Sequence, residues 1–237
     1  MASCGEMPGV LAVIVVTAGT SEYRQIVDAQ ARKCREFGYY HLIYDLGGLG
    51  IGEPYHVELE DLKPTVNGDS LPPATFKASL VAGTMEAAGA GELVCWLDAD
   101  CIPLRDFSLD ALACFDRIGS FDAAVTLRPA PEIGLSNNPA LDYLNSGVVW
   151  FRNNTHGRWL CELWHQRSLE MGTDQGALNQ VVMPRAGVSG WNSQRGKVLA
   201  GVLVLDAMEW NSWHPPFTGA RIAHFKRGIR ASAVNYL

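Results

Sequence analysis

An alternation of apolar runs and helical patterns opens the chain and constrains its fold more than any other feature. Residues 9–19, GVLAVIVVTAG, predict a buried strand that runs into a glycine-containing loop. Apolar residues at helical spacing follow, with Thr20 or Ser21 as the expected N-cap and Gly38 at the expected end of the helix. Residues 39–46, YYHLIYDL, supply a second strand. This β-α-β order predicts a parallel sheet with a right-handed crossover.

The rest of the chain continues as a mixture of strands and helices. Residues 47–75 hold enough glycine and proline to break any long element, so we expect a long loop there with one short strand. We expect further helices over about 75–88, 157–170 and 174–183, and further strands at ELVCWL (92–97), AAVTL (123–127), GVVWF (147–151), GVLVLD (201–206) and RIAHF (221–225). Neither an internal repeat nor a linker divides the sequence, which favours a single α/β domain with a mostly parallel sheet flanked by helices.

Composition is that of a folded soluble protein. The chain has 237 residues, of which 48% are hydrophobic and 19% charged. A formal net charge of -6, without a run of five basic residues, argues against nucleic acid as the main partner. The first apolar run is too short for a membrane span and follows Glu6 instead of a basic segment, so we expect a cytoplasmic protein.

The six cysteines are scattered and contain no CxxC pair, which excludes a zinc ribbon and a thioredoxin-type site. Cys34, Cys95 and Cys161 lie within apolar patterns. We therefore expect them to be small core residues and not to form disulfides.

The run LVCWLDADCIP, residues 93–103, ends an apolar strand in two acids. Ligands bind beyond the carboxyl ends of the strands in open α/β sheets, and Asp98 and Asp100 would lie there. Two carboxylates so close repel each other unless a cation or hydrogen-bond donors neutralise them. Their oxygens suit Mg²⁺ or Mn²⁺, and such an ion can hold a diphosphate. A solvated turn with one acid capping a helix is the alternative, and a lone D-x-D does not decide between the two.

Three further stretches carry polar residues beside apolar elements. YLNSGVVWFRNN puts Asn145 and Ser146 immediately before a buried strand. GTDQGALNQ begins a helix with Asp174 and Gln175. IAHFKRG, residues 222–228, offers an imidazole, an ammonium group and a flexible glycine at the end of the last strand.

Taken together and in this order, these stretches resemble the GT-A glycosyltransferases that use nucleotide-diphosphate sugars. The likeness is closest to the glycogenin and lipooligosaccharide-galactosyltransferase families and to the plant-type nucleotide-diphospho-sugar transferases, and it covers roughly residues 10–228. It implies a Rossmann-like GT-A domain with a nucleotide-binding part at about 9–100 and an acceptor-side part at about 101–237. It also implies metal-dependent transfer of a sugar from a UDP-hexose to a sugar, protein or small-molecule acceptor, with the anomeric configuration retained. HFKRG is shorter than the usual His-Gly-Lys-Pro-Trp segment.

The resemblance also implies a metal site and a phosphate site. The metal ligands would be Asp98, Asp100 and His224. Asp98 shares the ion or bonds the ribose, and an imidazole ligand favours Mn²⁺ over Mg²⁺. Lys226 would stabilise charge on the β-phosphate, with Arg227 as the competing cation. Gly228 would let backbone amides approach the same phosphate.

Further residues are expected to contact the donor. They are Thr17, Ala18 and Gly19 under the nucleoside, Tyr23 at the base, Asn145 and Ser146 at the sugar hydroxyls, and Lys77 and Ala99 elsewhere along the donor. Asp174 and Gln175 would line the sugar face opposite the leaving diphosphate and join Lys226 as catalytic residues. Three alternatives stay open: Tyr23 as a core residue, Lys77 as a solvated helix lysine, and Asp174 as a helix cap.

A late cluster of aromatic residues is assigned to the acceptor, because aromatic rings stack on sugar C–H faces; core packing is the more common fate of tryptophan. The cluster is Trp191, Trp210, Trp213 and His214.

Other functions fit the sequence less well. A sugar nucleotidyltransferase carries a glycine-rich basic loop after the first strand, whereas TAGTSEYRQ has one glycine. A phosphohydrolase of the haloacid-dehalogenase type has its D-x-D near the N-terminus, whereas here the motif is in mid-chain and Cys101, Ile102 and Pro103 follow it. A non-catalytic sugar-nucleotide-binding module would have lost the metal-binding residues, which are present here.

Overall fold

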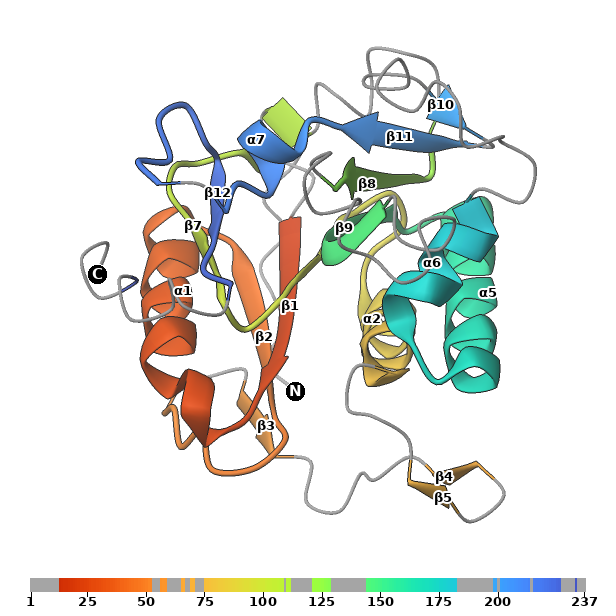
Figure 1. Ribbon diagram of the computed structural model, residues 1–237, viewed down its shortest axis with the longest axis horizontal. Coiled ribbons are helices and arrows are strands. Elements are labelled where there is room, and N and C mark those ends of the chain that lie inside the picture. The colour runs from red at the N-terminus through yellow and green to blue at the C-terminus, as the bar shows by residue number, and fades with distance from the viewer. Residues whose placement is uncertain are drawn as a thin grey trace.

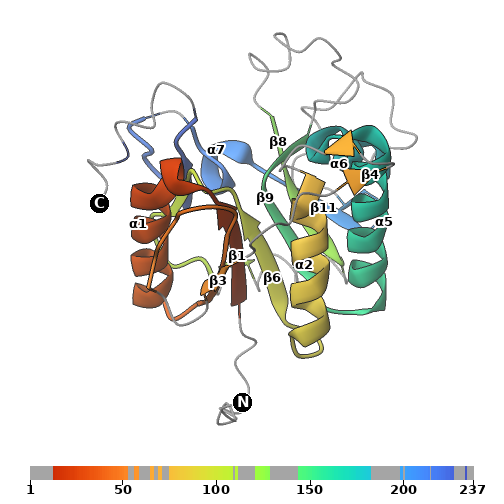
Figure 2. The same ribbon diagram turned by 90° about the horizontal axis from the view of Figure 1, so that it is seen from below.

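The fold is centred on an eight-stranded mixed sheet with helices on both faces (Figures 1 and 2). The computed structural model describes residues 13–52, 56–58, 65–66, 69–70, 75–108, 110–111, 121–128, 144–182, 198–199, 201–213, 215–226 and 233. The strand order of the large sheet is β10-β11-β8-β9-β6-β1-β2-β3. The helix α1 covers one face, and α2, α5 and α6 cover the other (Figure 2).

The elements have the following bounds. The large sheet comprises β1 (Val13–Gly19), β2 (Tyr40–Asp45), β3 (His56–Glu58), β6 (Leu93–Leu97), β8 (Ala123–Leu127), β9 (Leu144–Arg152), β10 (Val198–Leu199) and β11 (Val202–Leu205). Two small sheets pair β7 (Cys101–Pro103) with β12 (Ile222–His224) and β4 (Thr65–Val66) with β5 (Asp69–Ser70). The helices are the 3₁₀ turn η1 (Ser21–Tyr23), α1 (Arg24–Glu36), α2 (Phe76–Ala87), α5 (Thr155–Met171), α6 (Asp174–Val182) and α7 (Ala207–Trp210).

The parallel opening of the sheet is confirmed. Strand β1 lies between β2 and β6 and is parallel to both. Strand β9 runs antiparallel to both of its neighbours, β6 and β8. Because of that direction, the start of β9 lies beside the end of β6. We call the side of the sheet where β1, β2 and β6 end its carboxyl edge.

Both faces of the sheet bury apolar side chains. Every residue of β6 and β8 is buried and all but Thr126 are apolar, as expected for strands covered on two sides. One cluster joins the sheet to α2, α5 and α6 around the fully buried Trp164, and another fills the opposite face around Trp150 and Phe107. Cys34, Cys95, Cys101 and Cys161 are all buried free thiols, so the three predicted core cysteines are confirmed.

Some local predictions are wrong. Neither Thr20 nor Ser21 caps the first long helix: η1 precedes α1, and Tyr23 takes the N-cap position without a side-chain hydrogen bond. Gly38 does follow the helix, and its φ of 75° is one that glycine adopts readily. In the segment 47–75, the described residues form three short strands instead of one. The short elements β7, β10 and α7 were not expected.

Across the described residues, each helix is either too short or too polar to cross a membrane.

Candidate functional site

The D-x-D turn lies at the carboxyl edge, between the end of β6 and the start of β7. Asp98 follows Leu97 directly, and its backbone N–H donates to the carbonyl of Gly147 on β9 at 2.9 Å. The carbonyl of Asp98 accepts from the N–H of Cys101 at 2.9 Å, which closes the turn. The two carboxylates therefore occupy the place that the sheet topology predicts for a ligand site.

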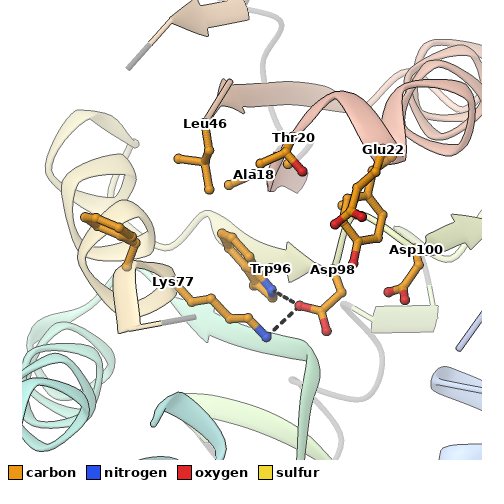
Figure 3. Close-up of a pocket in the computed structure, with 12 residues that line it drawn as sticks. Ala18, Thr20, Glu22, Leu46, Lys77, Trp96, Asp98 and Asp100 are labelled. Carbon is orange, nitrogen blue, oxygen red and sulfur yellow. Dashed lines mark hydrogen bonds and ion pairs between the residues drawn. The ribbon is translucent and has the colours of Figure 1, made fainter. Parts of the chain in front are cut away.

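A pocket of about 370 Å³ opens over this turn (Figure 3). Seven of the predicted site residues line it: Ala18, Gly19, Tyr23, Lys77, Asp98, Ala99 and Asp100. The other lining residues were missed by sequence reasoning: Thr20, Glu22, Leu46, Phe76 and Trp96. They mix an apolar wall with the carboxylate of Glu22. The side-chain alternation of β6 offered one usable signal, since Trp96 and Asp98 are two residues apart and so point to the same face.

Lys77 connects the pocket to the acids around it. Its Nζ lies 2.6 Å from Asp98 Oδ1 and 2.9 Å from Asp174 Oδ2, and its side chain is only 13% exposed. Burial works against the charged ammonium, but the carboxylates of Asp174 and Asp98 outweigh it and raise the pKa of Lys77. Lys77 is therefore no solvated helix lysine; it is the cation that these two acids share.

Asp174 lies within the same cluster, at the first residue of α6. Burial would raise the pKa of Asp174, yet the charge of Lys77, with hydrogen bonds from Ser146 and the backbone N–H of Gln175, holds it below its usual range. The carbonyl of Asp174 accepts from Trp164 Nε1 at 2.8 Å, which fixes the start of α6 against α5. Asp174 is thus the first residue of α6 and not its N-cap, and its carboxylate serves the ion pair with Lys77.

His224 reaches the D-x-D turn through the pairing of β12 with β7. The register places His224 opposite Cys101, the residue after Asp100. Its Nε2 lies 3.0 Å from Asp100 Oδ1 and 4.0 Å from Asp98 Oδ2. Two donors on one octahedral cation at about 2.1 Å lie about 3 Å apart, so the Asp100–His224 pair fits two ligand positions of a divalent cation. Among the described residues, buried Cys101 is the third side chain with a ligand atom within 4.8 Å of theirs, and Asp98 lies outside that group.

Gly147 shows that the space around these donors is confined. A Cβ added to Gly147 would lie 2.6 Å from His224 Cε1, 2.9 Å from Asn145 Oδ1 and 3.0 Å from Asp98 Oδ2. A side chain at this position would therefore displace two of the predicted metal ligands. The glycine lets β9 pass directly beside them.

A neutral network supports the turn from the other face of the sheet. Gln30 on α1 donates from Nε2 to the carbonyls of Cys101 at 2.8 Å and Asp98 at 3.2 Å. Its Oε1 accepts from Thr17 Oγ1 at 2.7 Å, and Thr17 in turn meets His41 Nε2 at 3.2 Å. Thr17 is fully buried and does not line the pocket; its hydroxyl bonds Gln30 and lies 3.1 Å from the carbonyl of Leu97, the last residue of β6.

The remaining predicted site residues do not line the pocket, and their contacts are as follows. Asn145 is buried, and its Oδ1 accepts from the N–H of Gly147 at 2.7 Å. Ser146 Oγ is 3.4 Å from Lys77 Nζ. Gln175 is partly exposed at the start of α6. Lys226 follows β12, and its Nζ lies 5.9 Å from the ring centre of Trp213.

The structure does not show the four residues predicted for the acceptor as one cluster. Trp210 is buried against Phe107 and Trp150, so it is a core residue and the prediction for it is wrong. Trp191 and His214 lie outside the described residues, as do Arg227 and Gly228.

Comparison with known proteins places the fold. The sequence matches neither a family model nor a curated protein. The structure is similar to a glycosyltransferase described as involved in glycosylation of the major capsid of PBCV-1, with a TM-score of 0.57 and 15% identity over 95% of this chain and 100% of that one.

Two larger proteins are similar over part of their length. The bifunctional glycosyltransferase WbbM gives a TM-score of 0.53 at 13% identity, over 98% of this chain and 50% of that one. GlyE from Streptococcus pneumoniae TIGR4 gives 0.54 at 14% identity, over 95% of this chain and 60% of that one. The chain therefore has the GT-A, nucleotide-sugar glycosyltransferase-like fold that its motif order implies.

Proposed function

We propose that this protein is a metal-dependent glycosyltransferase that takes a sugar from a nucleotide-diphosphate donor, a UDP-hexose by resemblance, and retains its anomeric configuration. One observation carries the proposal: a single pocket at the carboxyl edge joins the D-x-D turn, the Lys77–Asp174 pair and, through Asp100, His224. These groups come from four distant parts of the chain. Fold similarity adds support, because the similar structures named above are glycosyltransferases.

The cation in this proposal is Mn²⁺, or Mg²⁺ in its place. Asp98, Asp100 and His224 would hold it, and the imidazole nitrogen favours the softer Mn²⁺. When bound, the ion would supply positive charge for the donor diphosphate and for the phosphate that leaves. Lys226, at the end of β12, would add a second positive charge to the same leaving group.

The pocket walls suit the two ends of a nucleotide differently. Tyr23, Leu46 and Phe76 offer apolar surface to a nucleoside. Asp98 and Asp100, which also line the pocket, would offer oxygen ligands to a cation that neutralises the diphosphate. Asn145 and Ser146, on the first residues of β9, would meet the sugar beyond the diphosphate.

The environment of Asp174 supports retention. An inverting enzyme needs a carboxylate base that can take the acceptor proton. Asp174 is paired with Lys77 at 2.9 Å and has a lowered pKa, which makes it a weak base. A front-side route needs no such base, because the departing phosphate can accept the proton while Lys226 stabilises its charge. Asp174 and Gln175 would then orient the donor sugar.

A cytoplasmic location is part of the proposal. The four described cysteines are all free thiols, which suits a reducing compartment. The acceptor would be a sugar, a protein or a small molecule.

One experiment tests the function. The purified protein is incubated with a panel of UDP-, GDP- and ADP-sugars and Mn²⁺, and donor hydrolysis and transfer to model acceptors are followed. We expect hydrolysis of a UDP-hexose that chelator abolishes and that Asp100→Ala removes without unfolding the chain. Proton NMR of a product made from an α-linked donor should show an α linkage. Full activity in excess EDTA contradicts the cation, and a β-linked product contradicts retention.

A further inference from the structure

The second ring nitrogen of His224 is bound by a residue outside every motif described so far. His224 Nδ1 lies 2.8 Å from Oδ1 of Asn211, which follows the short helix α7. Nε2, on the other side of the ring, faces the carboxylates of the D-x-D turn. His224 is 3% exposed and Asn211 1%. One buried ring therefore separates an amide from the proposed cation site.

A third residue sets which way the amide points. Asn211 Nδ2 lies 3.0 Å from Oγ1 of Thr126, a fully buried residue on β8. An amide NH₂ only donates hydrogen bonds and an amide oxygen only accepts them. With Nδ2 donating to Thr126, Oδ1 faces the ring, so the ring proton must reside on Nδ1 of His224. The nitrogen left to ligate a cation beside Asp100 is therefore Nε2, which gives up any proton of its own when the cation binds.

The backbone fixes the distance between the two residues. The N–H of Asn211 donates to the carbonyl of Ala207 at 2.9 Å, which anchors it to α7. The next residue, Ser212, donates to Ile222 at 3.0 Å and accepts from the N–H of His224 at 2.6 Å. Asn211 and His224 are thus held on adjacent strands of backbone. Their contact does not depend on long, mobile side chains.

We propose that Asn211 is a positioning residue for the metal site: it keeps the proton on Nδ1 of His224 and fixes the ring so that Nε2 faces the cation shared with Asp100. The inference rests on the proposed metal-dependent function and adds a residue to it. Partners of this kind orient a metal-bound histidine, and their loss weakens metal binding about 10- to 100-fold.

The test compares three variants in the full chain. Asn211→Leu removes the acceptor at similar volume. Asn211→Asp keeps an oxygen that accepts from Nδ1. Asn153→Leu is the matched control, since Asn153 is equally buried at 1% exposed but bonds the carbonyls of Ala88 and Gly89, away from the site.

Two readouts are needed. Electron paramagnetic resonance of free Mn²⁺ gives the affinity for Mn²⁺ alone, without any nucleotide sugar. Long-range ¹H–¹⁵N NMR of the metal-free protein shows which nitrogen of His224 carries the proton. Neither readout requires turnover, and the NMR measurement requires no metal.

We expect Asn211→Leu to weaken Mn²⁺ binding about 10- to 100-fold and Asn211→Asp to stay within about threefold of the wild type. Asn153→Leu should lower stability but keep the Mn²⁺ affinity of the folded protein. In the wild type Nδ1 should carry a proton, and in Asn211→Leu its protonation should be lost or reduced.

Four results overturn the inference: wild-type Mn²⁺ affinity in Asn211→Leu, equal weakening in Asn153→Leu, an Nδ1 of His224 without a proton in the wild type, or a wild-type chain that binds no Mn²⁺. The first three leave the glycosyltransferase proposal standing. A chain that binds Mn²⁺ through Asn211 and His224 but cleaves no nucleotide sugar contradicts the proposed function alone.

Discussion

On the α2 face of the sheet the D-x-D turn is held by charge, whereas on the α1 face it is held by neutral hydrogen bonds. Lys77 lies between the carboxylates of Asp98 and Asp174 on the first face. On the second face, Gln30 bonds the backbone of the turn, and Thr17 bonds Gln30 and the carbonyl of Leu97 at the end of β6. The charged side meets the pocket and the neutral side is fully buried. The charged groups therefore lie at the pocket, where a ligand can contact them, and the groups that are shielded from water are neutral.

The charged and the neutral side should differ most in how much the free energy of unfolding falls when one side chain is removed. Lys77→Met leaves the buried carboxylate of Asp174 and the partly exposed one of Asp98 without their cation, and breaking a buried pair costs about 3–5 kcal/mol. We expect the free energy of unfolding in urea to fall by that amount. Lys77→Arg keeps the charge and is the control. Equal stability of Lys77→Met and Lys77→Arg would show that charge does not hold this side.

Loss of the neutral side should cost less. Gln30→Met keeps the shape of the side chain but leaves the buried carbonyls of Asp98 and Cys101 and the hydroxyl of Thr17 with one partner fewer. A buried group without its partner costs about 1–3 kcal/mol, so we expect a loss of about 2–3 kcal/mol. Urea unfolding measures it. A loss as large as that of Lys77→Met would erase the contrast between the two sides.

Because of His41, the neutral side should also make the stability of the protein depend on pH in the acid range. Burial lowers the pKa of His41 to about 3, far below the value of about 6.5 in the unfolded chain. The unfolded state thus binds more protons between those two values, and stability falls as the pH drops below about 6.5. Between pH 7 and pH 5 the loss is roughly 2 kcal/mol. His41→Gln, which cannot titrate, should show a flatter stability profile over this range; an unchanged slope would exclude His41 as its source.

The stability contributed by Asp174 and Lys77 on the charged side should not change between pH 7 and pH 5. Asp174 has a lowered pKa, so its contribution is present above the unfolded value of about 3.9 and is lost only as the pH falls through the folded value. Lys77 has a raised pKa, so its contribution is present below about 10.4 and is lost as the pH rises toward the folded value. The acid slope of wild type between pH 7 and pH 5 should therefore persist in Asp174→Asn.

The sequence predicts the side of the site that follows chain order and misses the side built by distant contacts. The β-α-β opening, the D-x-D strand and the helix of Lys77 are local patterns, and the structure confirms these elements. Gln30 carries no such signal, because its partners are backbone atoms 68 and 71 residues away. Asn211 follows a helix of one turn that has too few residues to show a period.

The direction of a strand within the sheet also cannot be predicted from the apolar pattern of its sequence. The run GVVWF reads as a buried strand in either direction, and its antiparallel pairing is set by the sheet as a whole. That pairing brings Asn145, Ser146 and Gly147 to the carboxyl edge, although Asn145 and Ser146 precede the run GVVWF and Gly147 begins it. From the sequence, the placement of Asn145 and Ser146 beside the D-x-D turn was implied only by the family resemblance. The antiparallel register of β9 with β6 is its physical cause.

The pairing of β7 with β12 has a consequence for the time course of folding. It joins Cys101 to His224, more than a hundred positions apart along the chain, so its formation requires closure of a very long loop. The parallel strands β1, β2 and β6 need far shorter closures and can assemble first. A chain caught between these two events would carry the acids of the turn without their imidazole. Cation affinity would then develop last, as a late marker that the final strand has docked.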